Sequence, residues 1–290
     1  MTSQKNFPFS SLKFKNCPYS IVLKIADMPI RISSENRALI ESAKARYKKF
    51  ISQGKNFCLD IEVFHSADLY FPNPDGTKNF YNEQTFQDGR SFIRSNYFTG
   101  YIELNNSFGK VLCSEIDPAS WLEHFLRIGY ATTAIGHKTM LFHGAGLIMD
   151  KKGLVFFGPS GCGKTTVTRL SSHYTVLGDD MVALTKKNGK FRVYATPFNS
   201  EKNGFLLTNT EAEVKAFYRL IQHKTTFLYK MNRANAMAEL LASISSINKN
   251  YQASLIALSL CSKLVEHIPC YELYFTRDNL FWRHIDGNSE

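Results

Sequence analysis

The sequence lacks a long hydrophobic segment. None of its apolar runs approaches the ~20 residues that a membrane-spanning helix needs. The first residues, Met1 to Phe9, are polar and lack the apolar core of a secretion signal. Hydrophobic residues make up 44% of the chain and charged residues 21%, which is typical of a soluble globular protein. We therefore expect a cytoplasmic protein without a membrane partner.

Cysteine motifs are also missing. The six cysteines are scattered and none forms a C-x-x-C pair, so neither a zinc site nor a disulfide framework is indicated. One of them, Cys162, lies in a glycine-rich segment just before an expected helix. Helix-end electrostatics lower the pKa of a thiol in such a place. The simpler interpretation, which we prefer, is that Cys162 fills a variable position of the loop.

The charge is unbalanced but not clustered. Lys and Arg number 35 against 25 acidic residues, which gives a formal net charge of +10. No run of five or more basic residues occurs, which argues against a dedicated nucleic-acid arm. We therefore expect no nucleic-acid partner, and a basic surface that suits nucleotide phosphates or an acidic peptide.

What the sequence does contain is a complete phosphate-binding P-loop, Gly-Pro-Ser-Gly-Cys-Gly-Lys-Thr. An apolar run at 154–157 precedes it as an expected strand, and 165–172 follows it as an expected helix, which is the context of a true P-loop. The predicted nucleotide-binding residues are consecutive: Gly158, Pro159, Ser160, Gly161, Cys162, Gly163, Lys164, Thr165 and Thr166.

The residue types of this loop explain its chemistry. Glycines let successive backbone amides turn toward the phosphates, and the positive end of the following helix faces the anion. Lys164 is expected to reach the β- and γ-phosphates of ATP, and the Thr165 hydroxyl is expected to ligate Mg²⁺. The alternative is a glycine-rich turn with an exposed lysine.

Two acids follow the next expected strand. Asp179 and Asp180 come directly after Thr175 to Gly178, where many P-loop proteins place the acid that meets Mg²⁺ or its water. Paired carboxylates suit two roles, one steadying the metal and the other accepting a proton from a hydroxyl nucleophile. The alternative is an Asp-Asp turn in solvent. His143 lies in an apolar stretch, and its position fits equally a core histidine and a partner of the acids.

The remaining patterns predict two domains. Residues 1–135 read as a small α+β region, with a helix over 34–52, a long polar loop over 72–90, and no catalytic constellation. A further helix is expected to begin at Asp117-Pro118, a capping residue followed by proline, and to run to about residue 135.

Residues 136–290 read as the P-loop domain. We expect short strands at 140–142 and 146–149 and a hairpin around 186–190. Beyond residue 209 we expect helices, since Val214, Phe217, Tyr218 and Ile221 fall on one helical face. A last strand is expected at 271–275.

The three motifs in register resemble the catalytic core of the HPr kinase/phosphorylase family. They are His143-Gly144, the P-loop, and the segment Val176 to Val182 with its Asp pair. The resemblance covers roughly 140–200 and implies an α/β P-loop kinase core of the HPr kinase/phosphoenolpyruvate carboxykinase type, with the smaller α+β domain before it. The layout looks closest to related kinases of peptide-modification gene clusters.

Carried over by residue, the resemblance implies roles in catalysis. Asp180 would be the general base, Asp179 would support Mg²⁺ or His143, and His143 would pair with the acids. Glu201 would give a second metal contact, and Arg277 would be the late arginine that the family uses.

The sequence also departs from that family. Thr166 stands where HPr kinases carry Glu, and a Thr-Pro-Phe segment replaces their Arg- and Gly-rich signature. ATP-dependent transfer is therefore better supported than recognition of the phosphocarrier protein or a reverse phosphorylase reaction. The related kinases assemble into hexamers, so the resemblance also implies a homo-oligomer.

The resulting hypothesis is an ATP- and Mg²⁺-dependent kinase that phosphorylates a hydroxyl, on Ser or Thr of a peptide or protein. One alternative is a kinase for a small-molecule alcohol, with the same chemistry in a closed pocket. Another is a nucleotide-sensing module without catalysis, which would need the P-loop but not the Asp pair.

Overall fold

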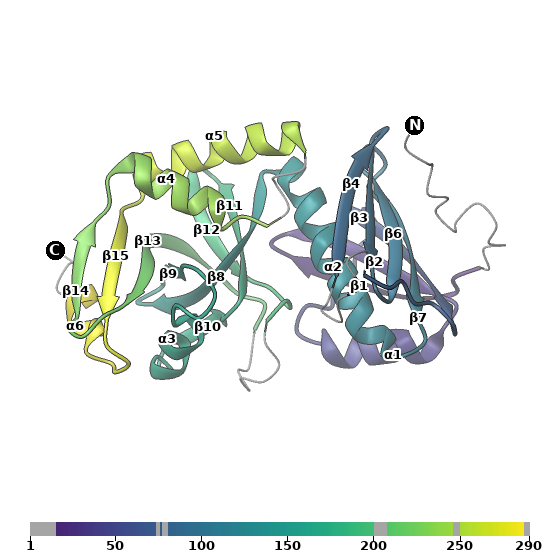
Figure 1. The fold of residues 1–290 in the computed structure, drawn as a ribbon, viewed down its shortest axis with the longest axis horizontal. Coiled ribbons are helices and arrows are strands. Elements are labelled where there is room, and N and C mark those ends of the chain that lie inside the picture. Colours follow the sequence, from purple (N-terminus) through teal and green to yellow (C-terminus); the bar gives the residue numbers. More distant parts are fainter. Residues whose placement is uncertain (1–15, 74–75, 77–80, 200–207, 246–249, 287–290) are drawn as a thin grey trace. The chain divides into compact units, whose positions relative to one another are not determined.

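The computed structural model describes residues 16–73, 76, 81–199, 208–245 and 250–286 of the chain. It is a mixed α/β structure with two sheets (Figure 1). Its contacts divide the chain into two compact units. The first holds Met1–Lys24 and Pro29–Gly129, and the second holds Ile25–Met28 and Tyr130–Glu290.

The first unit is built on a seven-stranded sheet of order β1-β2-β3-β7-β6-β5-β4. Pairs β2–β3 and β3–β7 are parallel, and β7–β6, β6–β5 and β5–β4 are antiparallel. In β3 the alternate residues Leu59, Ile61 and Val63 are fully buried. The strands are β1 (Tyr19–Ile25), β2 (Met28–Ser34), β3 (Leu59–Ser66), β4 (Asn82–Gln87), β5 (Arg90–Ser95), β6 (Phe98–Glu103) and β7 (Phe108–Ser114).

Two helices accompany this sheet. Helix α1 (Arg37–Arg46) begins after Asn36, whose side chain accepts a hydrogen bond from the Leu39 amide. It ends earlier than the expected boundary at residue 52. Helix α2 (Pro118–Ala134) begins at the predicted proline. It packs on β6, where a Cβ at Gly100 would lie 2.5 Å from the Phe125 ring.

The expected loop over 72–90 is wrong in part, because β4 lies within it. This strand is polar since it forms the edge of the sheet and has little to bury. Its buried Gln84 is satisfied by a hydrogen bond from Nε2 to Ser91 Oγ, 2.8 Å away. A polar edge strand of this kind shows no hydrophobic alternation.

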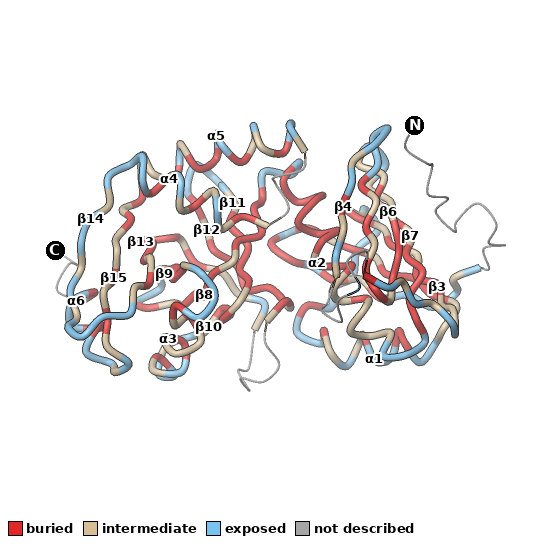
Figure 2. The backbone as a smooth tube through the Cα atoms, in the orientation of Figure 1, coloured by how far each residue is buried: buried red, intermediate tan, exposed pale blue. Residues whose placement is uncertain are grey.

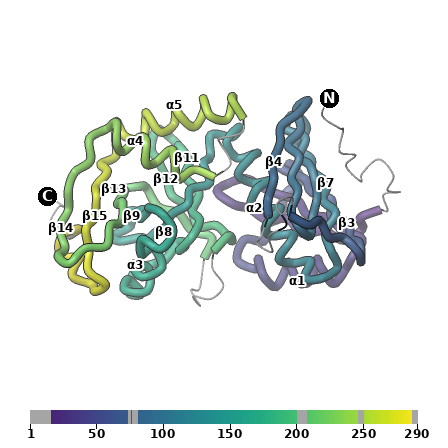
Figure 3. The backbone as a smooth tube through the Cα atoms, viewed as in Figure 1, coloured from purple at the N-terminus to yellow at the C-terminus, as the bar shows by residue number. Residues whose placement is uncertain are grey.

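The second unit is built on an eight-stranded sheet. Strands β8, β11, β12, β13 and β9 pair each with the next, and β9 pairs back with β8, so these five close a ring. Strand β13 also pairs in parallel with β15, and the tubes of the two strands run close to each other in Figure 3. The strands are β8 (Thr139–Met149), β9 (Lys152–Phe157), β10 (Thr175–Gly178), β11 (Met181–Lys187), β12 (Lys190–Ala195), β13 (Glu211–Gln222), β14 (Phe227–Lys230) and β15 (Cys270–Phe275).

The helices of this unit are short except for one. They are α3 (Lys164–Leu170), α4 (Arg233–Ala242), α5 (Tyr251–His267) and α6 (Phe281–Asp286), with a 3₁₀ turn η2 (Ile135–His137) before β8. One buried cluster joins the strands to α3 and α6, and it includes Phe156, Val167 and Trp282. Figure 2 shows buried residues concentrated along the strands and in α2. Among the described residues, no helix combines the length and apolar character needed to span a membrane.

Two expectations for this unit are wrong. The segment 211–222 is strand β13, not a helix. Both of its edges are paired and both faces are covered, so Ala216, Phe217 and Tyr218 are all buried. Because these three consecutive residues are all apolar, the strand does not show the alternation of apolar and polar residues that marks a strand with one buried face. The buried residues on one face are Ala212, Val214, Ala216, Tyr218 and Leu220.

Likewise, β8 is one strand and not two. Gly144 and Gly146 lie inside it because their neighbours approach closely. A Cβ at Gly144 would lie 2.9 Å from the Phe156 carbonyl oxygen, and one at Gly146 would lie 3.0 Å from Val182. These glycines therefore mark close packing and not a break.

Candidate active site

The glycine-rich loop connects the end of β9 to the start of α3 (Figure 1). Gly158, Gly161 and Gly163 have φ angles of +143°, +79° and +118°, which side-chain-bearing residues adopt only at a cost. Gly163 is further constrained, since a Cβ there would lie 2.6 Å from the ring of Phe275 in β15. The three glycines thus allow the backbone conformation of the loop, and Gly163 allows its close packing against β15.

Lys164 lies across this loop. Its side chain is buried, and its ammonium donates to the carbonyl oxygens of Gly158 at 2.9 Å and Pro159 at 3.3 Å. Among the described residues it has no carboxylate within ion-pair distance. The positive charge is therefore held at the loop by neutral acceptors, which an anion can replace.

Thr165 and Asp179 face each other. The Thr165 hydroxyl donates to Asp179 Oδ2 at 3.3 Å, and Asp179 is 3% exposed at the end of β10. A hydroxyl and a carboxylate are the hard oxygen ligands that Mg²⁺ takes beside water and phosphate, so these two residues fit the predicted ion. In the described part of the chain, no group of three or more His, Cys, Asp or Glu is arranged to hold a metal unaided. Glu201 lies outside the described residues.

Asp180 and His143 form a second pair. The two strands that carry them are neighbours, with Met181 opposite His143 in the β11–β8 ladder. His143 Nε2 lies 3.0 Å from Asp180 Oδ1, and the side chains are 40% and 36% exposed. The backbone amide of His143 donates to the carbonyl of Ser243 at the end of α4. The imidazole thus holds the Asp180 carboxylate at an open position.

These groups surround one cavity of about 270 Å³. It brings together residues that the sequence predicts from three separate motifs. They are His143, Ser160, Gly161, Gly163, Lys164, Thr165, Thr166, Asp179 and Asp180.

Other predicted residues lie beside this cavity and not on its wall. Gly158 and Pro159 contribute the carbonyls under Lys164. Cys162 is buried in the hydrophobic cluster. Arg277 Nη2 donates to Gln222 Oε1 at 3.3 Å, and Gln222 Nε2 donates to the Gly161 carbonyl at 2.8 Å. Arg277 therefore reaches the loop through Gln222.

Asn199 is a site residue for which the sequence analysis assigns no role. Its side-chain oxygen accepts hydrogen bonds from the backbone amides of Asp179, Asp180 and Met181. The Thr-Pro-Phe segment before it stands out in the sequence. The signal for Asn199 itself is weak, because one asparagine after a turn-like segment is common.

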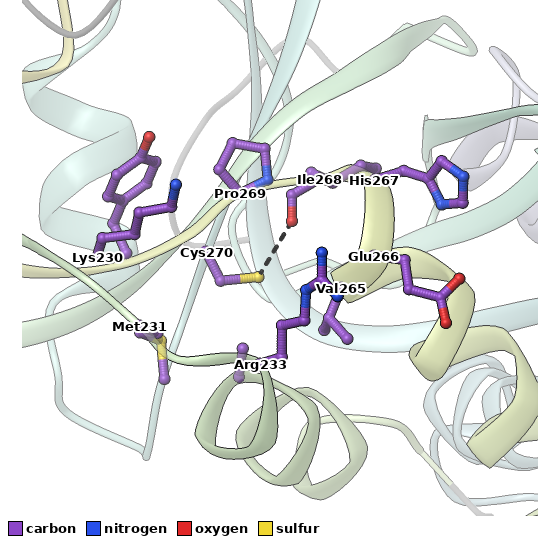
Figure 4. A pocket seen from close by; sticks show the side chains of 11 residues that line it. Lys230, Met231, Arg233, Val265, Glu266, His267, Ile268, Pro269 and Cys270 are labelled. Carbon is purple, nitrogen blue, oxygen red and sulfur yellow. Dashed lines mark hydrogen bonds between the residues drawn. The ribbon is translucent and has the colours of Figure 1, made fainter.

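A larger cavity of about 380 Å³ lies at the other end of β15, between the starts of α4 and β15 and the end of α5 (Figure 4). Lys230, Arg233 and Glu266 line it, together with mainly apolar residues. Burial raises the pKa of the Cys270 thiol there to about 12, so this thiol stays protonated at neutral pH. None of the predicted site residues that the structure describes lines it, and the P-loop cavity is the candidate active site.

Comparisons with known proteins give a family and a likeness among solved structures. The model of the family described as "SynChlorMet cassette protein ScmC" matches residues 111–288, more than half of the chain. No curated protein sequence matches. Among solved structures, the Hpr(Ser) kinase/phosphatase from Coxiella burnetii aligns with a TM-score of 0.31 and 11% identity. The alignment covers 51% of this chain and 95% of that one. A similarity this low does not indicate which reaction the chain catalyses.

Proposed function

This chain belongs to the family of SynChlorMet cassette protein ScmC, and we propose that it is a kinase that uses ATP and Mg²⁺ to phosphorylate a hydroxyl. The acceptor class is Ser or Thr of a peptide or protein. One observation carries the proposal. In a single cavity, the P-loop lysine and hydroxyl face two adjacent carboxylates, and each carboxylate has its own partner.

Nucleotide binding rests on the loop. The amides of residues 160–166 and the Lys164 ammonium would hold the phosphates, with Lys164 exchanging its carbonyl partners for phosphate oxygens. Arg277 would support the loop through Gln222 and Gly161. We further propose that the core is of the HPr kinase/phosphoenolpyruvate carboxykinase type, on the order of its motifs along β8, β9 and β10.

Thr165 and Asp179 would hold Mg²⁺, with Glu201 as a further contact. When bound, the ion neutralises charge on the β- and γ-phosphates. The cavity itself needs that charge, because its lining carries two carboxylates against one ammonium.

Asp180 would act as the general base. Its carboxylate takes the proton of the acceptor hydroxyl while that oxygen forms a bond to the γ-phosphorus. The bond from the γ-phosphorus to the β–γ bridging oxygen breaks, and ADP leaves with the electron pair. Lys164 stabilises the charge on the transferring group, and the His143 imidazole keeps the carboxylate aimed.

The openness of the site favours a large acceptor. Asp180 and His143 are each more than one third exposed, whereas a kinase for a small alcohol needs a base within a closed pocket. A peptide that lies over these residues would exclude water on binding. We therefore favour a peptide or protein over a small-molecule alcohol.

A transfer assay tests this proposal. The chain is incubated with ATP, Mg²⁺ and a mixture of Ser- and Thr-containing peptides and small alcohols, and phosphorylated products are identified by mass spectrometry. We expect phosphopeptides from the wild type, and none from Lys164→Met, which removes the charge at the phosphates. ATP binding without transfer to any hydroxyl would leave the nucleotide-sensing alternative. Transfer to small alcohols alone would replace the acceptor class.

A further inference from the structure

The turn that carries the Asp pair is tied to one side-chain oxygen. Asn199 Oδ1 accepts from the amides of Asp179 at 2.9 Å, Asp180 at 3.2 Å and Met181 at 3.4 Å. Successive amides that converge on one point form a concavity that normally receives an anion. Here a neutral amide oxygen from a residue about twenty positions later fills it.

The Asn199 side chain is also hydrogen-bonded to the segment that precedes it. Its Nδ2 donates to the Thr196 carbonyl at 2.6 Å. Thr196 is fully buried, and its hydroxyl donates to the Met181 carbonyl at 2.8 Å. Phe198 is buried too, with its ring 5.7 Å from that of Tyr130. We call residues 196–199 the clamp.

Gly178 makes room for the clamp. A Cβ at this position would lie 2.4 Å from Asn199 Oδ1 and 2.9 Å from the Met181 carbonyl oxygen. Gly178 is not among the residues with positive φ, so its backbone conformation would accept alanine. The glycine is required here by the close approach of the asparagine and of the Met181 carbonyl, and not by a positive φ.

We infer that Asn199 is a positioning residue that sets the directions of both catalytic carboxylates. This rests on the proposed function. Adjacent aspartates must point to different partners, Asp179 to Thr165 and Asp180 to His143. The backbone between them fixes that divergence, and the clamp fixes the backbone through three amides. A rotation of the turn would move both carboxylates at once.

The size of the effect follows from the geometry of catalysis. A displacement of about 1 Å at a reacting group can lower the rate about 100-fold. The loop that binds the nucleotide lies between β9 and α3 and makes no hydrogen bond to the clamp among the described residues. Loss of the clamp should therefore lower kcat, while ATP without Mg²⁺, whose binding does not involve Asp179 as a metal ligand, should bind as before.

The first test replaces Asn199 with leucine, which has a similar shape but no acceptor. Hydrogen–deuterium exchange of the segment 179–181 is measured with the ATP dissociation constant and kcat. We expect faster exchange, an ATP affinity in the absence of Mg²⁺ that is unchanged, and a fall in kcat of about 100-fold. Asn199→Asp restores an acceptor oxygen and should recover protection of the amides and part of kcat.

A second variant reaches the same contact without changing a polar group. Gly178→Ala displaces the asparagine by steric overlap and should reproduce the exchange and kcat of Asn199→Leu. Val193→Ala, in the buried core of β12, is the control. It lowers the melting temperature but should leave kcat and the exchange of 179–181 unchanged.

The outcomes separate this inference from the proposed function. Unchanged exchange in Asn199→Leu would overturn the clamp itself. Faster exchange with full kcat in both variants would overturn the positioning role while the kinase stands. A wild type that transfers no phosphate would overturn the kinase, and the exchange data would still decide whether the clamp exists.

Discussion

Among the described residues that line the cavity, Lys164 supplies the one full positive charge, against the carboxylates of Asp179 and Asp180. Two like charges next to the phosphates of ATP repel the nucleotide unless a cation offsets them. At the residue scale, this imbalance leads us to propose that nucleotide binding, as well as phosphate transfer, depends on a metal ion.

We therefore predict that chelation of Mg²⁺ weakens ATP binding to the wild type by at least about tenfold, a loss of ~1.4 kcal/mol. Asp179→Asn removes one repelling charge and one metal ligand, so its ATP affinity should depend much less on Mg²⁺. Isothermal titration with and without chelator measures both. Equal Mg²⁺ dependence in the two proteins would show that Asp179 does not serve the metal.

The environment of His65 indicates that the stability of the fold falls as the pH is lowered. Its ring nitrogens are buried without hydrogen-bond partners, and burial lowers its pKa, with Glu115 and Glu35 opposing the shift. A histidine with a lowered folded-state pKa takes up a proton more readily when unfolded, so its stabilising contribution is lost as the pH falls below about 6.5. His124 contributes with the same sign, since burial and then Arg127 and Arg46 lower its pKa.

The test is the melting temperature from neutral pH to about pH 5. It should fall on acidification in the wild type, and His65→Phe should fall less steeply because the group that titrates is gone. The matched change Lys24→Met, on the exposed side of β1, should leave the slope unaltered. A steeper slope in His65→Phe would contradict the assignment.

The residues of the site were predictable to different degrees. The P-loop and the Asp pair are contiguous patterns whose chemistry depends on residue type, so the sequence alone places them. His143 was undecided, because its pairing with Asp180 depends on the β8–β11 register. Asn199 was missed since its partners lie about twenty residues away and are backbone amides, which leave no mark on the sequence.

At the scale of elements, the loop between β9 and α3 depends on the fit of Gly163 against β15. We predict that Gly163→Ala abolishes ATP binding, because the added Cβ meets Phe275 and the φ of +118° is strained. The backbone strain is of order 1–3 kcal/mol. Gly189→Ala is the control, because it has a φ of +80° with no atom within 4 Å of its Cβ.

Both variants should therefore lose stability, and Gly163→Ala alone should lose the nucleotide. Thermal melting and ATP titration of the two proteins measure this. Full ATP affinity in Gly163→Ala would mean that close packing of the loop against β15 is not required for ATP binding.

Elements were predictable where one periodicity dominated. The start of α2 carries capping and proline signals, and β3 alternates cleanly. Strand β13 was predicted as a helix because burial on both faces erases alternation. Strand β4 was predicted as loop because an edge strand has few apolar residues. In both cases the neighbours in the sheet, and not the segment itself, decide the pattern.

At the scale of the whole molecule, the net charge of +10 bears on the acceptor. A basic protein attracts an anionic peptide, and salt screens that attraction. We predict that the KM for an acidic acceptor peptide rises as salt is added, whereas the KM for a neutral peptide of the same length stays nearly constant. Steady-state kinetics at several salt concentrations would measure both, and equal salt dependence would show that surface charge plays no part in recognition.

The central claim is that Asp180 accepts the proton of the acceptor hydroxyl. The most direct measurement compares single-turnover phosphate transfer and ATP binding in Asp180→Asn and in the control Asp150→Asn, which alters an exposed acid in the turn after β8. The account predicts ATP affinity that is not weakened in either protein, full transfer in Asp150→Asn, and a loss of transfer of about 10²- to 10⁴-fold in Asp180→Asn. Transfer by Asp180→Asn at the wild-type rate would contradict it.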